Sequence, residues 1–367
     1  MNINSKAAHS TGDQPACRDN IRHLSVYLYP QTPFLLRPGS NDYIFRLKAE
    51  LNKDFKVVNG ITRLGLLDLL LKLHRCDVVY FNWIEDVSDK RLGFLQVLLL
   101  FLILCTCKLT GIRIAWFVHN NVSHRRKNWR TKQLVRKMMA GFSDHIFSHS
   151  TTPDLPGETE LKVFDHPVEA LRSQVTGNSY RYDLLIWGSV SRYKGVADFV
   201  RFCHDHNYLR NLRIHIAGAF AGEELYEDVM NYRTENITVV NKVHSEQELA
   251  ALFSESRYIL FCYQSDSVLA SAALCHSLSY GKTVIGPDRG AFRDLQGKGL
   301  AFTYRSFHEL PELLADMKAA NIYVNQDKLD DYIRRTGWQQ FGNFLRDELS
   351  GTAVAEPVTQ RTAEAIL

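Results

Sequence analysis

The 367-residue sequence predicts an α/β fold with two domains, each built around a parallel β-sheet. Short runs rich in β-branched and aromatic residues alternate with stretches whose apolar residues recur at helical spacing, which is the pattern of doubly wound sheets. With 45% hydrophobic residues, the chain is long enough to bury two cores of ordinary size. A glycine-containing turn between a strand and a helix gives the second half its clearest functional signal.

That turn follows a predicted buried strand over 183–187 and precedes a predicted helix over 196–203. It holds glycines, serines and cations at a helix N-terminus, where free backbone N–H groups favour an anion. We expect it to bind the diphosphate of a nucleotide, and a solvated strand-to-helix loop is the alternative. The residues expected to contact this diphosphate are Gly188, Ser189, Arg192 and Lys194.

The remainder of the second half continues the alternation of strands and helices. Strands are expected over 212–218, 237–240, 258–263 and 281–286, and helices over 248–254 and 268–280. A polar loop over 264–267 precedes the last of these helices. The start of that helix is expected to offer backbone N–H groups to the same phosphates, from Ser267, Val268 and Leu269.

Three polar loops in the first half follow or adjoin predicted strands. Strands are expected over 24–29, 56–58, 77–83, 112–118 and 144–150, and helices over 43–51 and 64–74. The loops cover 38–43, 82–86 and 119–124. Because the carboxyl ends of strands in open α/β sheets face the ligand crevice, these loops are candidates for a site. Their titratable candidates are Asp42, Glu85, Asp86 and His119.

Two segments of the first half raise the question of a membrane. Residues 94–107 are almost wholly apolar but shorter than the roughly 20 residues that span a bilayer. We favour a buried helix packed on the sheet over a helix lying in the membrane plane. Residues 124–139 carry seven Lys or Arg and no acid, together with Trp129 and several aliphatic residues. They suit either an anionic membrane surface or a solvated basic face.

Composition excludes several other classes. Seven cysteines, odd in number and mostly within apolar runs, read as reduced core thiols of a cytosolic protein rather than as disulfides. The net charge of +4 and the lack of a nucleic-acid module argue against a nucleic-acid partner. No Asp-x-Asp clamp occurs, and Cys203 to His206 is read as a polar helix end, so no metal site is predicted. The polar residues 1–20 resemble no signal peptide and are expected to be a disordered tail.

Four motifs, in this order, resemble bacterial GT-B glycosyltransferases of exopolysaccharide and capsule assembly. They are Asn-Trp-x-Glu at 82–85, Val-His-Asn at 118–120, Arg-Tyr-Lys-Gly at 192–195 and Ser-Tyr-Gly-Lys-x-Val-Ile at 279–285. The sequence is most similar to the inverting β-mannosyltransferase type. The resemblance covers residues 180–300 well and the first half more loosely.

The resemblance implies two Rossmann-like domains that face a central cleft. After the tail, an acceptor-binding domain would cover 21–170 and a nucleotide-sugar domain 171–335. A helix over 336–350 would cross back to the first domain through Trp338, Phe341 and Phe344, and 351–367 would be a loose tail. It also implies that His244 lies near the nucleotide base, although a structural role is the alternative, and that Asp266 contacts the donor sugar.

The sequence departs from the large retaining family that shares the fold. That family has two glutamates at the positions that Val268 and His276 occupy here, and neither residue can replace a carboxylate. An inverting reaction needs a base for the acceptor hydroxyl and positive charge on the departing diphosphate. We prefer Glu85 as the base, with Asp42, Asp86 and His119 as alternatives. Lys194 and Arg192 are expected to stabilise the leaving group without a metal, and Asn41 and Asn120 to bind the acceptor.

These inferences predict a metal-independent hexosyltransferase without a cofactor. It would move a hexose, with mannose from GDP-mannose favoured, to a lipid-linked saccharide in surface polysaccharide synthesis. The expected location is cytoplasmic, peripheral on the inner face of the cell membrane. Two alternatives are a sugar-nucleotide epimerase on the same fold and a non-catalytic nucleotide-binding subunit of a transferase complex.

Overall fold

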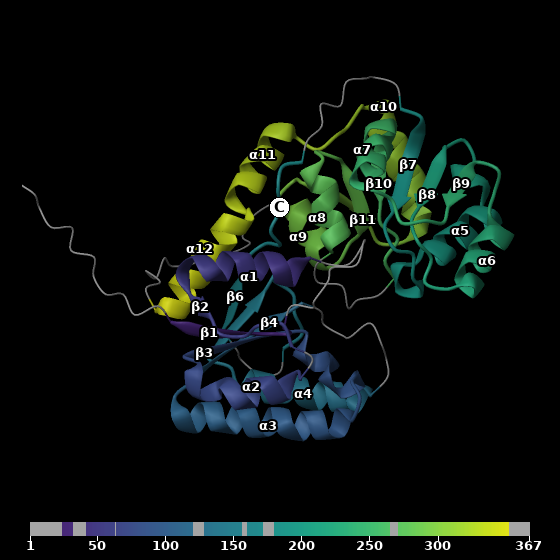
Figure 1. The fold of residues 1–367 in the computed structure, drawn as a ribbon. Coiled ribbons are helices and arrows are strands. Elements are labelled where there is room, and N and C mark those ends of the chain that lie inside the picture. Colours follow the sequence, from purple (N-terminus) through teal and green to yellow (C-terminus); the bar gives the residue numbers. More distant parts are fainter. Residues whose placement is uncertain are drawn as a thin grey trace, which may run out of the picture.

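The computed structural model describes residues 24–31, 42–62, 64–119, 128–155, 160–171, 180–264 and 271–351. A six-stranded sheet forms the centre of each half of the chain, and all strand pairs in both sheets are parallel (Figure 1). Helices flank both sheets, so the predicted α/β class is confirmed.

The N-terminal sheet has the strand order β2-β1-β3-β4-β5-β6. Its strands are β1 (Ser25–Tyr29), β2 (Lys56–Val57), β3 (Val78–Asn82), β4 (Arg113–Val118), β5 (His145–Ser148) and β6 (Leu161–Val163). Its helices are α1 (Tyr43–Asp54), α2 (Leu66–Lys72), α3 (Gly93–Thr110) and α4 (Trp129–Phe142), with the 3-10 helices η1 (Leu73–Arg75) and η2 (Ile84–Asp89).

The two faces of this sheet are buried by different helices. Alternate residues of a strand point to opposite faces, so Val79 and Phe81 of β3 enter the core that α2, α3 and α4 cover. Tyr80, between them, enters the core that α1 and the last helix cover. Figure 1 shows α1 on one face of the sheet and α2, α3 and α4 on the other. Burial on both faces explains why β3 and β4 are nearly continuous apolar runs.

The C-terminal sheet has the strand order β12-β11-β10-β7-β8-β9. Its strands are β7 (Tyr182–Trp187), β8 (Ile214–Ala217), β9 (Ile237–Val240), β10 (Ser256–Leu260), β11 (Val284–Pro287) and β12 (Ala301–Tyr304). Its helices are α5 (Val196–Asp205), α6 (Glu223–Tyr232), α7 (Glu246–Glu255), α8 (Ala272–Ser279), α9 (Gly290–Gly297), α10 (Leu310–Ala319) and α11 (Gln326–Arg335), with the 3-10 helices η3 (Arg192–Lys194), η4 (Asn207–Leu209) and η5 (Phe307–Glu309).

The last helix, α12 (Trp338–Ser350), packs against α1 of the N-terminal half (Figure 1). The ring of Phe341 is fully buried between Phe117, His149 and Phe164, with centroid distances of 5.9, 5.4 and 5.2 Å. Trp338 reaches Tyr43 at 5.3 Å. This aromatic packing ties the end of the chain to the N-terminal sheet.

Polar contacts join the two halves as well. Asp294 on α9 accepts hydrogen bonds from the hydroxyls of Ser150 and Thr151, at 2.7 and 2.9 Å, just beyond β5. Lys298 forms an ion pair with Asp165, which follows β6. Because these partners lie about 140 residues apart in the chain, they hold the halves in a defined relative position.

Replacing Phe341 tests the docking of α12. We expect Phe341→Ala to lower the free energy of unfolding by about 3–5 kcal/mol, because it leaves a cavity between buried rings. Denaturant unfolding followed by circular dichroism measures this change. Tyr208→Ala is the control, since that ring is largely exposed in the C-terminal half, and it should change stability by less than about 0.5 kcal/mol. Equal losses for both variants would contradict the packing described.

Candidate functional site

The strand order of the C-terminal sheet reverses between β7 and β10, which lie side by side at its centre. Loops that leave these two strands turn to opposite faces of the sheet and leave a crevice where ligands bind in this class of fold. The loop after β7 is the predicted diphosphate turn. The loop after β10 runs into 265–270, which lies outside the described residues together with the predicted contacts Asp266, Ser267, Val268 and Leu269.

The turn after β7 depends on two glycines, Gly195 within the turn and Gly218 directly after β8. Gly195 has φ +68°, and a Cβ there would lie 2.0 Å from the carbonyl oxygen of Cys262, just beyond β10. A Cβ on Gly218 would lie 1.8 Å from the carbonyl oxygen of Gly188. The turn is therefore pressed against its neighbours by backbone contacts that no other residue permits. Tyr193 stacks on Tyr263 with a centroid distance of 6.1 Å, which fastens the turn to the end of β10.

Lys194 is the cation that lies within this turn. Its Nζ donates a hydrogen bond to the Ser189 hydroxyl at 3.2 Å, and a Cβ placed on Gly188 would be 3.7 Å from it. Burial lowers the pKa of Lys194 to about 8. No carboxylate in the described part of the chain pairs with its ammonium group. A desolvated cation without an anionic partner favours an anionic ligand, since a bound anion would stabilise the charge.

Unlike Lys194, Arg192 is exposed and is paired with a carboxylate. Its guanidinium donates to Glu224 on α6 at 2.9 Å, and its side chain is 64% exposed. Since exposed ion pairs contribute little, this contact would not hold Arg192 against a competing phosphate.

His244 stands just before α7, beyond the edge strand β9, and burial lowers its pKa. Three predicted donor contacts, Gly188, Ser189 and Lys194, thus lie together, whereas Arg192 faces α6 and His244 follows β9.

The carboxyl edge of the N-terminal sheet carries a cluster of aromatic and imidazole rings. His119, after β4, stacks on Trp83 at 4.2 Å and lies 5.0 Å from Tyr43. His149 and His166 complete the cluster, with a Tyr43 hydroxyl to His149 Nε2 distance of 3.0 Å and a His149 to His166 ring distance of 4.7 Å. Burial lowers the pKa of all three histidines, that of His166 to about 4. The rings are therefore neutral at physiological pH.

Asn82 sets the tautomer of His119. Its Nδ2 donates to the carbonyl oxygen of Tyr29 at 3.2 Å, so its Oδ1 faces His119 Nε2 at 2.9 Å and accepts the proton of that nitrogen. Nδ1 of His119 is then the proton-accepting nitrogen. Its low pKa makes His119 a weak base, better suited to a hydrogen bond with a hydroxyl than to full proton transfer.

Asp42 lies at the junction of the two halves. Half-exposed before α1, it accepts from Arg46 at 2.5 Å, and Arg46 also pairs with Glu169 at 2.5 Å. Burial lowers the pKa of His276 on α8, and Arg46 and Asp42 act on the same imidazole with opposite signs. Side chains of both halves thus meet here, around His276.

Glu85 and Asp86 lie on η2, toward α4 rather than α1. Burial raises the pKa of Glu85 to about 7, although Arg136 of α4 acts in the opposite direction from 3.7 Å. Among the described residues, the buried Oε1 of Glu85 makes no hydrogen bond, and the Arg136 guanidinium lies 3.7 Å from it. Asp86 is half-exposed and pairs with Lys132 at 3.2 Å. The predicted acidic candidates therefore separate, with Glu85 and Asp86 on the α4 side and Asp42 with His119 on the α1 side.

Tyr43, Asn82, His149, His166 and Arg46 were not predicted as site residues from the sequence, although Tyr43 and Asn82 lie in the candidate loops 38–43 and 82–86. The rule that singled out His119, a polar residue at the carboxyl end of a strand, also applies to Asn82, the last residue of β3, and to His149, directly after β5. His166 and Arg46 gave no such signal, because only the packing of the halves brings them to the junction. Asn41 and Asn120 lie outside the described residues. In the part of the chain that is described, no group of three or more acidic, His or Cys side chains is arranged to hold a metal.

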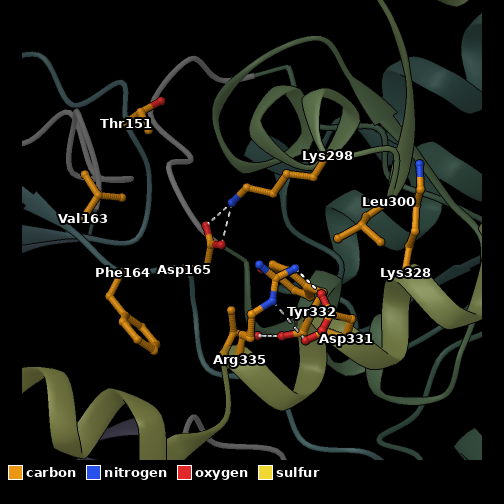
Figure 2. A pocket seen from close by; sticks show the side chains of 11 residues that line it. Thr151, Val163, Phe164, Asp165, Lys298, Leu300, Lys328, Asp331, Tyr332 and Arg335 are labelled. Atoms are coloured by element: carbon orange, nitrogen blue, oxygen red, sulfur yellow. Dashed lines mark hydrogen bonds and ion pairs between the residues drawn. The ribbon is translucent and has the colours of Figure 1, made fainter. Parts of the chain in front are cut away.

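A cavity of about 640 Å³ opens between the two halves at a different place. Figure 2 shows its lining side chains, including the Asp165–Lys298 ion pair and Arg335 beside Asp331. None of the predicted site residues lines it. The cavity borders the segments that connect the two halves, so its size alone does not make it the substrate site.

Comparison with known proteins gives one curated relative. The chain is 25% identical over 240 residues to the GDP-mannose:glycolipid 4-beta-D-mannosyltransferase of Xanthomonas campestris pv. campestris, covering 63% of this chain and 68% of the relative. No family model matches the chain.

Solved structures show the same fold. Anabaena HepE in complex with UDP and glucose matches 90% of this chain and all of its own, with a TM-score of 0.65 and 10% identity. The lipopolysaccharide outer core galactosyltransferase WaaB in its apo form matches 90% of this chain and 99% of its own, with a TM-score of 0.58 and 12% identity. The predicted GT-B fold and the predicted resemblance to glycosyltransferases are confirmed, and with them the assignment as a transferase.

The pKa of Lys194 predicts how the affinity for a nucleoside diphosphate depends on pH. The anion binds the protonated ammonium, so affinity should be steady below about pH 8. Above that pH it should fall by up to about tenfold per unit, because deprotonation competes with binding. Isothermal titration with GDP and UDP measures the profile.

Two variants separate charge from shape. Lys194→Ala should weaken binding about ten- to a hundredfold at pH 7. Lys194→Arg keeps its charge at all these pH values, so its affinity should no longer fall above pH 8. An unchanged pH profile in Lys194→Arg would show that another group causes the fall.

Proposed function

We propose that the protein transfers a hexose from a nucleoside diphosphate sugar to a lipid-linked saccharide acceptor, with inversion, in surface polysaccharide synthesis. The observation that carries the proposal is Lys194, a partly desolvated cation in a backbone-locked turn at the switch point of a GT-B fold. The Xanthomonas relative, named for GDP-mannose and a glycolipid, supports mannose as the sugar and a lipid-linked acceptor.

The C-terminal half supplies the leaving-group side of the reaction. As the bond between the anomeric carbon and the diphosphate oxygen breaks, negative charge grows on the nucleoside diphosphate. Lys194 and the N-terminus of α5, which begins at Val196 directly after Gly195, stabilise that charge. These groups are held in place before the reaction, so little reorganisation is needed. They would serve in place of a divalent cation.

We assign the base to Glu85. The acceptor hydroxyl transfers its proton to a Glu85 carboxylate oxygen while its own oxygen forms the new bond to the anomeric carbon. A pKa of about 7 suits this task, because the carboxylate is then both ionised near neutral pH and basic enough to take a proton.

The junction supports inversion and orients the sugar. His276 stands where a retaining enzyme would carry a glutamate, and its described charged neighbours are Glu246, Arg46 and Asp42. We infer that Asp42 and His119 bind sugar hydroxyls. In this assignment, the donor in the C-terminal half and the acceptor in the N-terminal half must come into contact for the reaction. Helix α12 connects the two halves and keeps them facing each other.

A ligand screen followed by a transfer assay tests the proposal. Thermal shifts with GDP, UDP, CMP and dTDP compounds identify the nucleotide, since a ligand that binds only the folded state raises the melting temperature. Transfer from the matching sugar donor to a lipid-linked saccharide is then followed by chromatography, and the anomeric configuration of the product by NMR. A retained configuration would overturn inversion. Isomerisation of the donor without acceptor would indicate an epimerase, and binding without turnover a non-catalytic subunit.

The two perturbed pKa values predict a bell-shaped pH profile for kcat/KM. Activity requires ionised Glu85 and protonated Lys194, so it should rise with pH through about 7 and fall above about 8. Glu85→Gln should lower kcat by about 10²- to 10⁴-fold, as expected for loss of a general base. Asp86→Asn, one residue away and half-exposed, is the matched control and should retain the rising limb. A full loss in the control but not in Glu85→Gln would move the base to Asp86.

A further inference from the structure

Helix α3 is apolar around its whole circumference but buried on one side alone. Val97, Leu100, Ile103, Leu104 and Cys107 lie in the core beneath the sheet. At about 100° per residue, they occupy one side of the helical wheel. Bulky side chains on the opposite side are exposed, and they are Phe94, Leu95, Leu98, Phe101, Leu102 and Leu109. The predicted packing of this segment on the sheet therefore accounts for one side of the helix and leaves the opposite apolar side uncovered.

The exposed side of α3 continues onto the neighbouring helices. Leu67 and Leu71 of α2 and Trp129 and Leu134 of α4 are also exposed. Both helices pack against α3. We call the exposed apolar side chains of α2, α3 and α4 the apolar face. In Figure 1, α3 runs along the outer edge of the N-terminal half, on the side of the sheet away from α1 and α12. Contiguous apolar surface of this kind marks an interaction site rather than ordinary solvent-exposed surface.

The charge around the apolar face identifies its partner. From Lys90 to Ser143, the sequence that contains α3 and α4 has no Asp or Glu. Arg91, Arg130 and Lys137 are exposed cations beside the exposed leucines, and Trp129 stands among them. Cations with an aromatic ring at the border of an apolar surface match the headgroup region of an anionic bilayer. A protein partner would not require this uniform sign.

The fold decides how the helix meets the bilayer. Of the described helices, α3 is the one long and apolar enough to cross a membrane, yet 28% of its 18 residues are buried in the protein. The chain enters α3 from η2 and leaves it into β4, so both ends of the helix connect to the N-terminal half. Crossing the bilayer would pull Leu100, Ile103 and Leu104, all fully buried, out of the core. The helix can lie in the interface without any such change.

We propose that the apolar face docks on an anionic lipid bilayer with α3 parallel to the membrane plane. This deepens the proposed function, because it places the N-terminal half against the membrane in which a lipid-linked acceptor resides. The docking itself depends on α3 and the surrounding cations and not on catalysis. It can therefore be measured without donor or acceptor.

Vesicle flotation tests the proposal with the full-length protein. We expect binding to vesicles of phosphatidylglycerol and phosphatidylcholine, and much weaker binding to phosphatidylcholine alone or at high salt. The triple variant Phe94→Ser, Leu98→Ser, Leu102→Ser should lower the partition coefficient at least about tenfold, because it removes apolar area that enters the interface. Phe101 is left in place, since its ring contacts Phe142 at 6.0 Å.

Matched controls come from the C-terminal half. Tyr208→Ser with Val243→Ser removes apolar side chains of similar exposure, and Arg210→Gln with Arg233→Gln removes exposed cations. Both should bind vesicles like the wild type, whereas Arg130→Gln with Lys137→Gln should bind more weakly. Circular dichroism and the thermal shift with nucleotide confirm that each variant is folded. Hydrogen exchange adds a measurement without mutation, and peptides of α3 should be protected when vesicles are added.

The results of the vesicle-binding experiments can be distinguished from those of the transfer assay. Equal binding by the triple variant and the wild type would overturn the proposal, as would failure of the wild type to bind anionic vesicles. If light scattering instead shows a wild-type dimer and a monomeric triple variant, without vesicle binding, the face is a protein interface and the proposal is wrong. Vesicle binding without any transferase activity would support the docking and contradict the proposed function.

Discussion

The return of α12 to the N-terminal sheet is the contact on which the arrangement of the two halves depends. Phe341 is buried among rings from β4 and from the segments after β5 and β6, while Trp338 touches Tyr43 at the start of α1. The same start of α1 carries Asp42 and Arg46, which act on His276 across the junction. The helix that fastens the halves thus also positions the side chains through which they face each other.

Burial acts in opposite directions on the two groups that we assign to chemistry. Desolvation disfavours whichever form is charged, so it raises the pKa of Glu85 and lowers that of Lys194. The pKa of Glu85 rises to about 7 and that of Lys194 falls to about 8, so both lie near neutral pH. One physical cause therefore leaves a carboxylate that readily takes up a proton and an ammonium group that gains from a bound anion. No metal is needed for either effect, although a metal-free reaction stays a prediction.

The sequence predicted the architecture well where strands are buried on both faces. The central strands β3, β4 and β7 appear as continuous apolar runs because helices cover both sides of them. It did not predict β6 or β12, which are short edge strands with half-buried residues, nor α6, in which only Leu225 and Val229 are buried. Such elements leave few apolar residues in a window, so their periodicity is weak.

The residues of the candidate site also differ in how far the sequence predicts them. Residues that directly follow a strand, such as His119 and Lys194, were found because their position in the chain fixes their position in the fold. The contacts that decide their chemistry could not be predicted, because the hydrogen bond between Asn82 and His119 joins residues 37 positions apart in the chain. The surroundings of Glu85 likewise depend on Arg136 of α4, and a sequence alone gives no measure of that contact.

The proposed orientation of α3 on a bilayer has a kinetic consequence. An enzyme held flat on a lipid surface meets a membrane-borne substrate by lateral diffusion in two dimensions rather than by collision from the bulk. Its turnover then follows the mole fraction of acceptor in the leaflet. Diluting that acceptor with inert lipid would slow the reaction even when the total amount of acceptor in the tube is constant.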